Sequence, residues 1–172
     1  MGESRGESIA VTASADPLKT AFRAGHECAH AVLAMRFGAG VLPLWLEEGL
    51  AQLAGWRAAD TFARTDGLQS RPVPPPEPWL DFDALVATAD YPGDAASVAA
   101  FYWQSALLVR ALHARLGPAA FGEFLSVAAS GGDVSAHLRE KCWFSDGDFE
   151  RLRRAVLPDA PPLPESASGW ML

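Results

Sequence analysis

The sequence predicts a mainly α-helical domain with a short β segment at its N-terminus, an α+β fold class. Between residues 17 and 156, apolar residues recur at helical spacing in several stretches bounded by proline, glycine or capping residues. A β-prone run over 9–12 precedes them. A chain of 172 residues, 49% hydrophobic and 20% charged, suits a single core. We therefore expect one domain over residues 1–157 and a loosely ordered, proline-rich tail over 158–172.

The first predicted helix spans residues 17–37. Asp16 can cap it, and Pro17 fits the first helical position, where its missing N–H costs nothing. Gly38 is a suitable C-terminal stop. Gly25 is out of place, because a glycine inside a helix costs about 1 kcal/mol relative to alanine. It is either a tolerated defect or a source of room for a substrate or strand close to a bound metal, for which the next residues provide candidate ligands.

Residues 26–30 read His26-Glu27-Cys28-Ala29-His30, an H-E-x-x-H motif. Residues four apart on a helix share a face, so His26 and His30 direct two imidazoles at one point, as two ligands of a tetrahedral zinc would lie. Glu27 lies on the flank of that face, where it can reach a water on the metal without being a ligand. Cys28 falls on the opposite side. The string also occurs by chance in unrelated proteins, so it needs support from the rest of the chain.

The second predicted helix spans residues 43–58. Pro43 marks its start, and its apolar residues form a stripe. Two adjacent carboxylates, Glu47 and Glu48, interrupt this stripe. A catalytic zinc usually has three protein ligands, and a buried carboxylate is costly without a metal or a charged partner, so one or both could face the first helix. Alternatively, both are solvated first-turn glutamates that the helix dipole favours.

The remainder of the chain indicates a proline-rich connection followed by further helices. The expected elements are an extended loop over 71–78, a short helix over 82–88, a long helix over 97–116, a helix from Pro118 to the turn at 130–132, and short helices over 133–141 and 146–156. Gly117 and Pro118 separate the long helix from the next one. Ser145 and Asp148 resemble a capping box with Asp in place of the usual Glu.

The H-E-x-x-H motif is followed, after a short loop, by P-x-W-L-x-E-G-x-A over residues 43–51. This pair of motifs resembles the gluzincin metallopeptidases, in particular the peptidase MA-like family, and the resemblance covers most of the chain. It implies a zincin-like domain of a hydrolase whose cofactor is Zn²⁺. By the resemblance, His26, His30 and Glu48 correspond to the metal ligands. Glu27 corresponds to the catalytic glutamate that activates water.

A later predicted helix carries Tyr102-Trp103-Gln104-Ser105, followed by apolar residues. The family has a Tyr-x-x-Ser pattern on a later helix, and related gluzincins use a tyrosine in a comparable position to stabilise the oxyanion. The resemblance therefore implies a catalytic role for Tyr102. Alternatively, Tyr102 packs in the helical core, since Phe101 and Trp103 beside it are also aromatic.

These motifs favour a zinc-dependent peptidase that acts on a peptide or protein substrate. The family normally has a larger β-rich portion before the zinc helix, whose edge strand holds the substrate, whereas 25 residues precede His26 here. The substrate-binding wall is then reduced, or a partner chain completes the N-terminal sheet, or the chain is a fragment of a longer protein. The alternative function is a non-catalytic zinc-binding interaction or scaffold module. The third reading is a metal-free helical protein with a chance motif.

Composition argues against several other classes of protein. A net charge of −7 without a basic stripe argues against a nucleic-acid partner. No run of about 18 apolar residues occurs, so we expect no membrane-spanning helix. The polar N-terminus lacks the apolar stretch of a signal peptide. We expect the chain as written to be cytoplasmic, unless it is a fragment, with Cys28 and Cys142 as reduced thiols.

Overall fold

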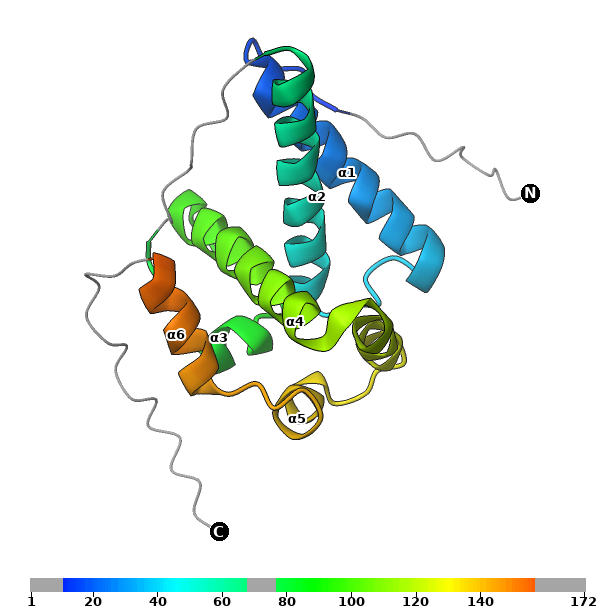
Figure 1. The fold of residues 1–172 in the computed structure, drawn as a ribbon, viewed down its shortest axis with the longest axis vertical. Helices are drawn as coiled ribbons and strands as arrows, with labels where there is room; N and C mark the ends of the chain where they lie inside the picture. Colours follow the sequence, from blue (N-terminus) through cyan, green and yellow to red (C-terminus); the bar gives the residue numbers. More distant parts are fainter. Residues whose placement is uncertain (1–10, 68–76, 157–172) are drawn as a thin grey trace.

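The computed structural model describes residues 11–67 and 77–156, which form helices and no strand. In chain order the elements are α1 (Pro17–Phe37), α2 (Leu44–Thr65), α3 (Phe82–Ala87), α4 (Ala95–Ala129), α5 (Val134–Glu140) and α6 (Asp146–Val156). α1 and α2 lie side by side, α4 crosses α2, and the three short helices gather near α4 (Figure 1). The mainly α-helical class is confirmed. Most of the loop over 71–78 and all of the tail over 158–172 lie outside the described residues.

The expected β segment over 9–12 is not seen. Val11 and Thr12 have no regular secondary structure, and residues 9 and 10 lie outside the described part of the chain. A side chain holds this segment instead, since Arg23 Nη1 of α1 donates to the carbonyl of Thr12 at 3.1 Å. A β-prone run becomes a strand only when another strand pairs with it, and the described residues offer none.

Capping residues set the ends of α1 as the sequence predicts. Asp16 accepts a hydrogen bond from a first-turn backbone N–H at 2.9 Å, and Gly38 ends the helix with a φ of 99°. In contrast, α2 continues to Thr65, past its predicted end at residue 58. No glycine or proline interrupts residues 58–65, and Ala63 on this extension is buried, so both local sequence and packing extend the helix.

Gly25 lies where α1 packs tightly against α2. A Cβ at this position would come within 2.6 Å of the Ala58 Cβ and 2.8 Å of the Ala54 carbonyl oxygen. Gly55 of α2 is packed in the same way, since a Cβ there would come within 2.7 Å of the ring of Phe22. Gly25 therefore allows two helix backbones to approach closely. Both sequence-based explanations, a tolerated defect and room beside a metal, were wrong, because the close approach of α2 is a tertiary feature.

Replacing Gly25 by alanine is expected to lower the free energy of unfolding by about 1–3 kcal/mol, because the added methyl overpacks the helix interface. Urea denaturation measures the change. Gly122 provides the matched control, since it lies inside α4 with nothing within 4 Å of a Cβ. Gly122→Ala is expected to raise the free energy of unfolding by about 0.5–1 kcal/mol. Equal effects of the two substitutions would contradict the close packing at Gly25.

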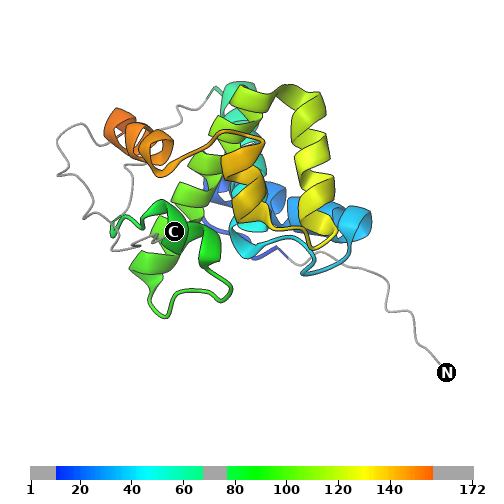
Figure 2. The ribbon, with the colours of Figure 1, turned by 90° about the horizontal axis from the view of Figure 1, so that it is seen from below.

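The core lies between α2, α4 and the short helices. Gly117, with φ 73° and ψ 169°, and Pro118 divide α4 into two arms as predicted, and Figure 2 shows these arms at a sharp angle. The predicted capping box at α6 is also present, because the Ser145 N–H donates to Asp148 Oδ2 at 2.9 Å. The fully buried large apolar side chains of the core are Trp45, Leu46, Phe82, Leu85, Phe101, Leu108, Leu112, Phe124, Leu138 and Phe149.

Helix α4 is long and apolar enough to cross a membrane by length and composition alone, although it contains no uninterrupted run of about 18 apolar residues. Half of its most apolar 18-residue stretch is buried inside the protein, and core helices of soluble proteins have the same length and composition. The absence of a membrane span therefore stays a prediction. Cys28 is exposed and Cys142 is buried, and both are free thiols, as expected.

Candidate metal centre

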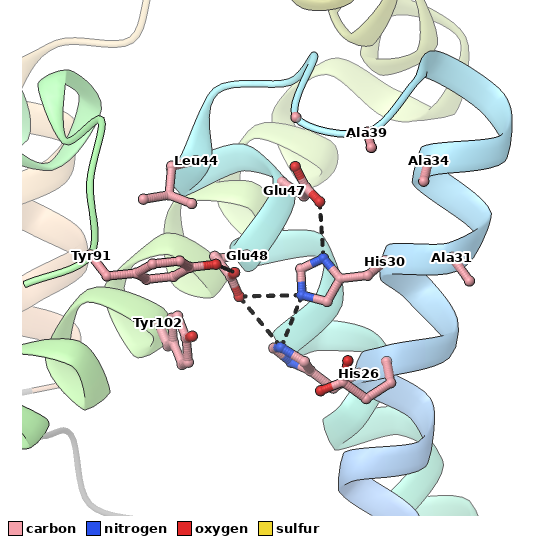
Figure 3. Close-up of a pocket in the computed structure, with 12 residues that line it drawn as sticks. His26, His30, Ala31, Ala34, Ala39, Leu44, Glu47, Glu48, Tyr91 and Tyr102 are labelled. Atoms are coloured by element: carbon pink, nitrogen blue, oxygen red, sulfur yellow. Dashed lines mark hydrogen bonds and ion pairs between the residues drawn. The ribbon is translucent and has the colours of Figure 1, made fainter. Parts of the chain in front are cut away.

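His26 and His30 lie one turn apart on α1 and point toward the side chains of α2 (Figure 3). His26 is buried, with 8% of its surface exposed, and His30 is half-buried. Their Nε2 atoms are 3.1 Å apart. The helical spacing of the H-E-x-x-H motif thus brings two imidazole nitrogens together, as the sequence predicts.

Glu48, from the first turns of α2, completes a triangle of donor atoms with the two histidines. Its Oε2 lies 3.4 Å from Nε2 of His26 and 3.5 Å from Nε2 of His30. Zinc bonds of about 2.0–2.1 Å at tetrahedral angles separate ligand atoms by about 3.3–3.4 Å. All three separations in this group are close to that value. The group therefore has the size of three corners of a zinc tetrahedron.

Two buried polar atoms of this group lack partners. Glu48 is only 1% exposed, and among the described residues neither its Oε2 nor Nδ1 of His26 has a hydrogen-bond partner. A buried carboxylate oxygen without a partner is costly, and a metal ion supplies the missing interaction. The orphaned oxygen also lies nearly equidistant from the two histidine nitrogens. These residues fit a zinc ion in both donor chemistry and spacing.

The charges of the group also favour a cation. The nearby carboxylate of Glu48 raises the pKa of His30 to about 9, although burial opposes the shift. Burial alone would raise the pKa of Glu48, but the neighbouring imidazoles of His26 and His30 outweigh it and lower that pKa to about 2. Glu48 is therefore ionised at neutral pH, and without metal His30 carries a proton that a divalent cation would displace.

Both adjacent glutamates face α1, but they occupy different positions. Oε1 of Glu47 lies 3.0 Å from Nδ1 of His30, on the side of the ring away from the donor triangle. A histidine that donates its Nδ1–H to a carboxylate presents its Nε2 lone pair to a metal. Glu47 thus orients His30, whereas Glu48 lies with the candidate ligands. Neither is the solvated first-turn residue that the sequence also allowed.

Glu27 and Tyr102 both line the cleft that contains the donor triangle. Glu27 is exposed at the cleft, next to His26 on α1. Tyr102 of α4 is half-buried, and its ring centroid lies 5.8 Å from that of His26. Burial raises the pKa of Tyr102, and the negative charge of Glu48 adds to the shift, so the hydroxyl stays protonated and can donate. The ring of Tyr102 also packs against Phe101, so it contributes to both the cleft and the aromatic packing.

Tyr91 is a site residue that sequence reasoning missed. It lies in the loop between α3 and α4, and its hydroxyl donates a hydrogen bond to Oε1 of Glu48 (Figure 3). Burial and this hydrogen bond both raise the pKa of Tyr91. A loop tyrosine between Asp90 and Pro92 has no periodicity or motif to mark it. Its contact with Glu48, 43 residues away, is visible only in the fold.

The cleft is open to solvent and has a volume of about 630 Å³. Its polar side carries the histidines, the glutamates and the two tyrosines. The other residues that line it are small or apolar: Ala31, Ala34, Ala39, Gly40 and Leu44. A volume in this range suits a small-molecule or peptide segment, and the small side chains leave the polar groups accessible.

No protein-family profile matches the chain, and no curated protein or solved structure is significantly similar to it. Function is therefore inferred from the residues of the site and from the two sequence motifs.

Proposed function

We propose that this protein is a zinc-dependent peptidase built on a zincin-like helical domain. The observation that carries the proposal is the convergence of His26, His30 and Glu48 at tetrahedral spacing in an open cleft. An H-E-x-x-H string occurs by chance, but chance does not supply a buried third donor from a second helix. The resemblance to gluzincin metallopeptidases supports the same three ligands.

Glu27 is the general base of the proposed reaction. A zinc ion held by the three ligands would polarise the scissile carbonyl and lower the pKa of a water from near 16 toward about 7. Glu27 accepts a proton from the attacking water and later passes it to the leaving amine. Two features support this role. Glu27 lines the cleft without belonging to the donor triangle, and its side chain is exposed, which gives it room to reach first the attacking water and then the leaving amine.

Tyr102 and Glu47 assist the proposed reaction in separate ways. The hydroxyl of Tyr102 donates to the substrate oxygen that becomes negative in the transition state. Its position in the cleft and its raised pKa support this role, because the hydroxyl keeps its proton at neutral pH. Glu47 holds His30 in the tautomer and orientation that ligation requires.

A non-catalytic zinc-binding module is the second candidate function. One observation favours it: the described residues contain no strand beside the cleft that could bind an extended peptide. In this alternative the zinc stabilises the packing of α1 on α2, and the cleft contacts a partner. A partner chain that completes a sheet beside α1 would instead restore the substrate-binding wall, and that partner stays a prediction.

Cleavage of a peptide library separates the two candidate functions. We expect the zinc-loaded protein to cleave members of the library, detected by mass spectrometry. Cleavage should stop when a chelator removes the zinc and return when zinc is restored. Stoichiometric zinc without cleavage of any peptide would reject the peptidase in favour of the non-catalytic module.

A further inference from the structure

We propose that Tyr91 is a positioning residue of the metal centre, whose hydrogen bond to Oε1 of Glu48 keeps this glutamate a single-oxygen ligand through Oε2. The inference rests on the proposed function, because it assumes that Glu48 binds zinc. It assigns a role to a loop residue that lies in neither sequence motif. Figure 3 shows Tyr91 reaching the carboxylate of Glu48 from the side opposite the histidines.

The two oxygens of Glu48 have different surroundings. Oε1 accepts the hydrogen bond from the Tyr91 hydroxyl. Oε2 has no hydrogen-bond partner among the described residues and lies 3.4 and 3.5 Å from the two histidine nitrogens. Because Glu48 is 1% exposed, its carboxylate is shielded from solvent beside the tyrosine. The carboxylate is therefore held at one oxygen and directed toward the metal position with the other.

This arrangement determines how many positions the metal keeps open. A catalytic zinc site has three protein ligands and a fourth position for water or substrate. If both oxygens of Glu48 coordinated the metal, the carboxylate would occupy two positions and crowd the open one. The hydroxyl of Tyr91 engages Oε1 and so disfavours the two-oxygen mode. Partners of this kind, which contact ligands rather than the metal, orient the ligands and tune metal affinity.

The surroundings of Tyr91 fix its hydroxyl in place even though 53% of the residue is exposed. Its ring meets the ring of Tyr102 edge-on, with the centroids 6.1 Å apart. Three residues further on, Asp94 caps α4 by accepting from the Ser97 N–H at 2.9 Å, which anchors the end of the loop. A rigid aromatic ring and a capped helix start thus hold the donor at a defined distance from Glu48.

Tyr91→Phe tests the inference with the metal alone. The substitution keeps the half-exposed ring and removes only the hydroxyl, so the metal-free protein should fold, with a melting temperature lowered by several degrees because the buried Oε1 of Glu48 loses its partner. We expect zinc affinity, measured by competition with a chromophoric chelator, to fall by about 10–100-fold. With Co²⁺ in place of zinc, the visible absorption bands should weaken, because Glu48 then coordinates through both oxygens and raises the coordination number.

Tyr102→Phe is the matched control, because it removes the other phenol of the same cleft while the hydrogen bond to Glu48 remains. Its zinc affinity and Co²⁺ spectrum should stay much closer to those of the wild type than those of Tyr91→Phe, because the ring that contacts Tyr91 is kept. An unchanged zinc affinity and Co²⁺ spectrum in Tyr91→Phe, or equal changes in both variants, would overturn the inference about Tyr91. Neither result would contradict the metal site itself. A wild-type chain that binds no metal would overturn the inference together with the proposed function. Metal binding without peptide cleavage would remove only the peptidase.

Discussion

Replacing Glu27 by glutamine is expected to lower kcat by about 10²–10⁴-fold while zinc stays bound. The amide keeps the size of the side chain but cannot accept a proton from the attacking water. The metal site should be preserved, because Glu27 is exposed and lies outside the donor triangle of His26, His30 and Glu48. The measurement is kcat for the best library peptide, with zinc content determined on the same samples.

Glu47→Gln is the matched control for this prediction, because it makes the same change at a neighbouring carboxylate of the cleft. Glu47 contacts Nδ1 of His30, so its loss should weaken zinc binding by about 10–100-fold. At saturating zinc, however, this variant should retain most of its turnover. Unchanged turnover in Glu27→Gln would contradict the assignment of Glu27 as the general base. An equal loss of kcat in both zinc-saturated variants would show that the effect is not specific to Glu27.

Zinc is expected to raise the melting temperature of the protein by about 8–16 °C when it is supplied at a thousandfold excess over its dissociation constant. At that excess, a ligand specific for the folded state adds about 4 kcal/mol to the free energy of unfolding. For a chain of this size each kcal/mol shifts the melting temperature by about 2–4 °C. The physical origin is the buried Oε2 of Glu48, which has no hydrogen-bond partner among the described residues and would bind the metal together with the two histidines.

His30→Ala is the control for the zinc-dependent shift. This variant removes one donor of the triangle, while Glu48 and His26 remain 3.4 Å apart. Two donors do not hold zinc as tightly as three, so the melting temperature should be the same with zinc and with a chelator. A zinc-dependent rise that persists in His30→Ala would mean that the metal stabilises the protein at another place.

The local features of the fold were predictable because they depend on neighbours in the sequence. Asp16 and Gly38 mark the ends of α1, and the kink at Gly117 lies where the sequence places it. The juxtaposition of His26 and His30 follows from helical periodicity alone. Glu48 was predicted as the third ligand from the resemblance of its motif to that of the gluzincins. The structure places its carboxylate beside both histidines.

The features that sequence reasoning missed or left open depend on contacts between distant segments. Tyr91 meets Glu48 only because the loop before α4 folds over α2. Glu47 contacts His30 because the short connection between α1 and α2 brings the start of α2 beside the histidine. The sequence alone left open whether Glu47 faces the first helix or solvent. Gly25 is explained by the backbone of α2, not by its own helix. The prediction of a β segment was wrong for the same reason, since a single run of residues does not show whether another strand pairs with it.

Metal content of the purified protein is the most direct test of the central claim, that His26, His30 and Glu48 form a zinc site. We would measure it by mass spectrometry on the wild type and on His30→Ala after exposure to zinc and removal of the excess. The account predicts about one zinc per wild-type chain and its loss in the variant. A wild-type chain that retains no metal after zinc is supplied would contradict the account.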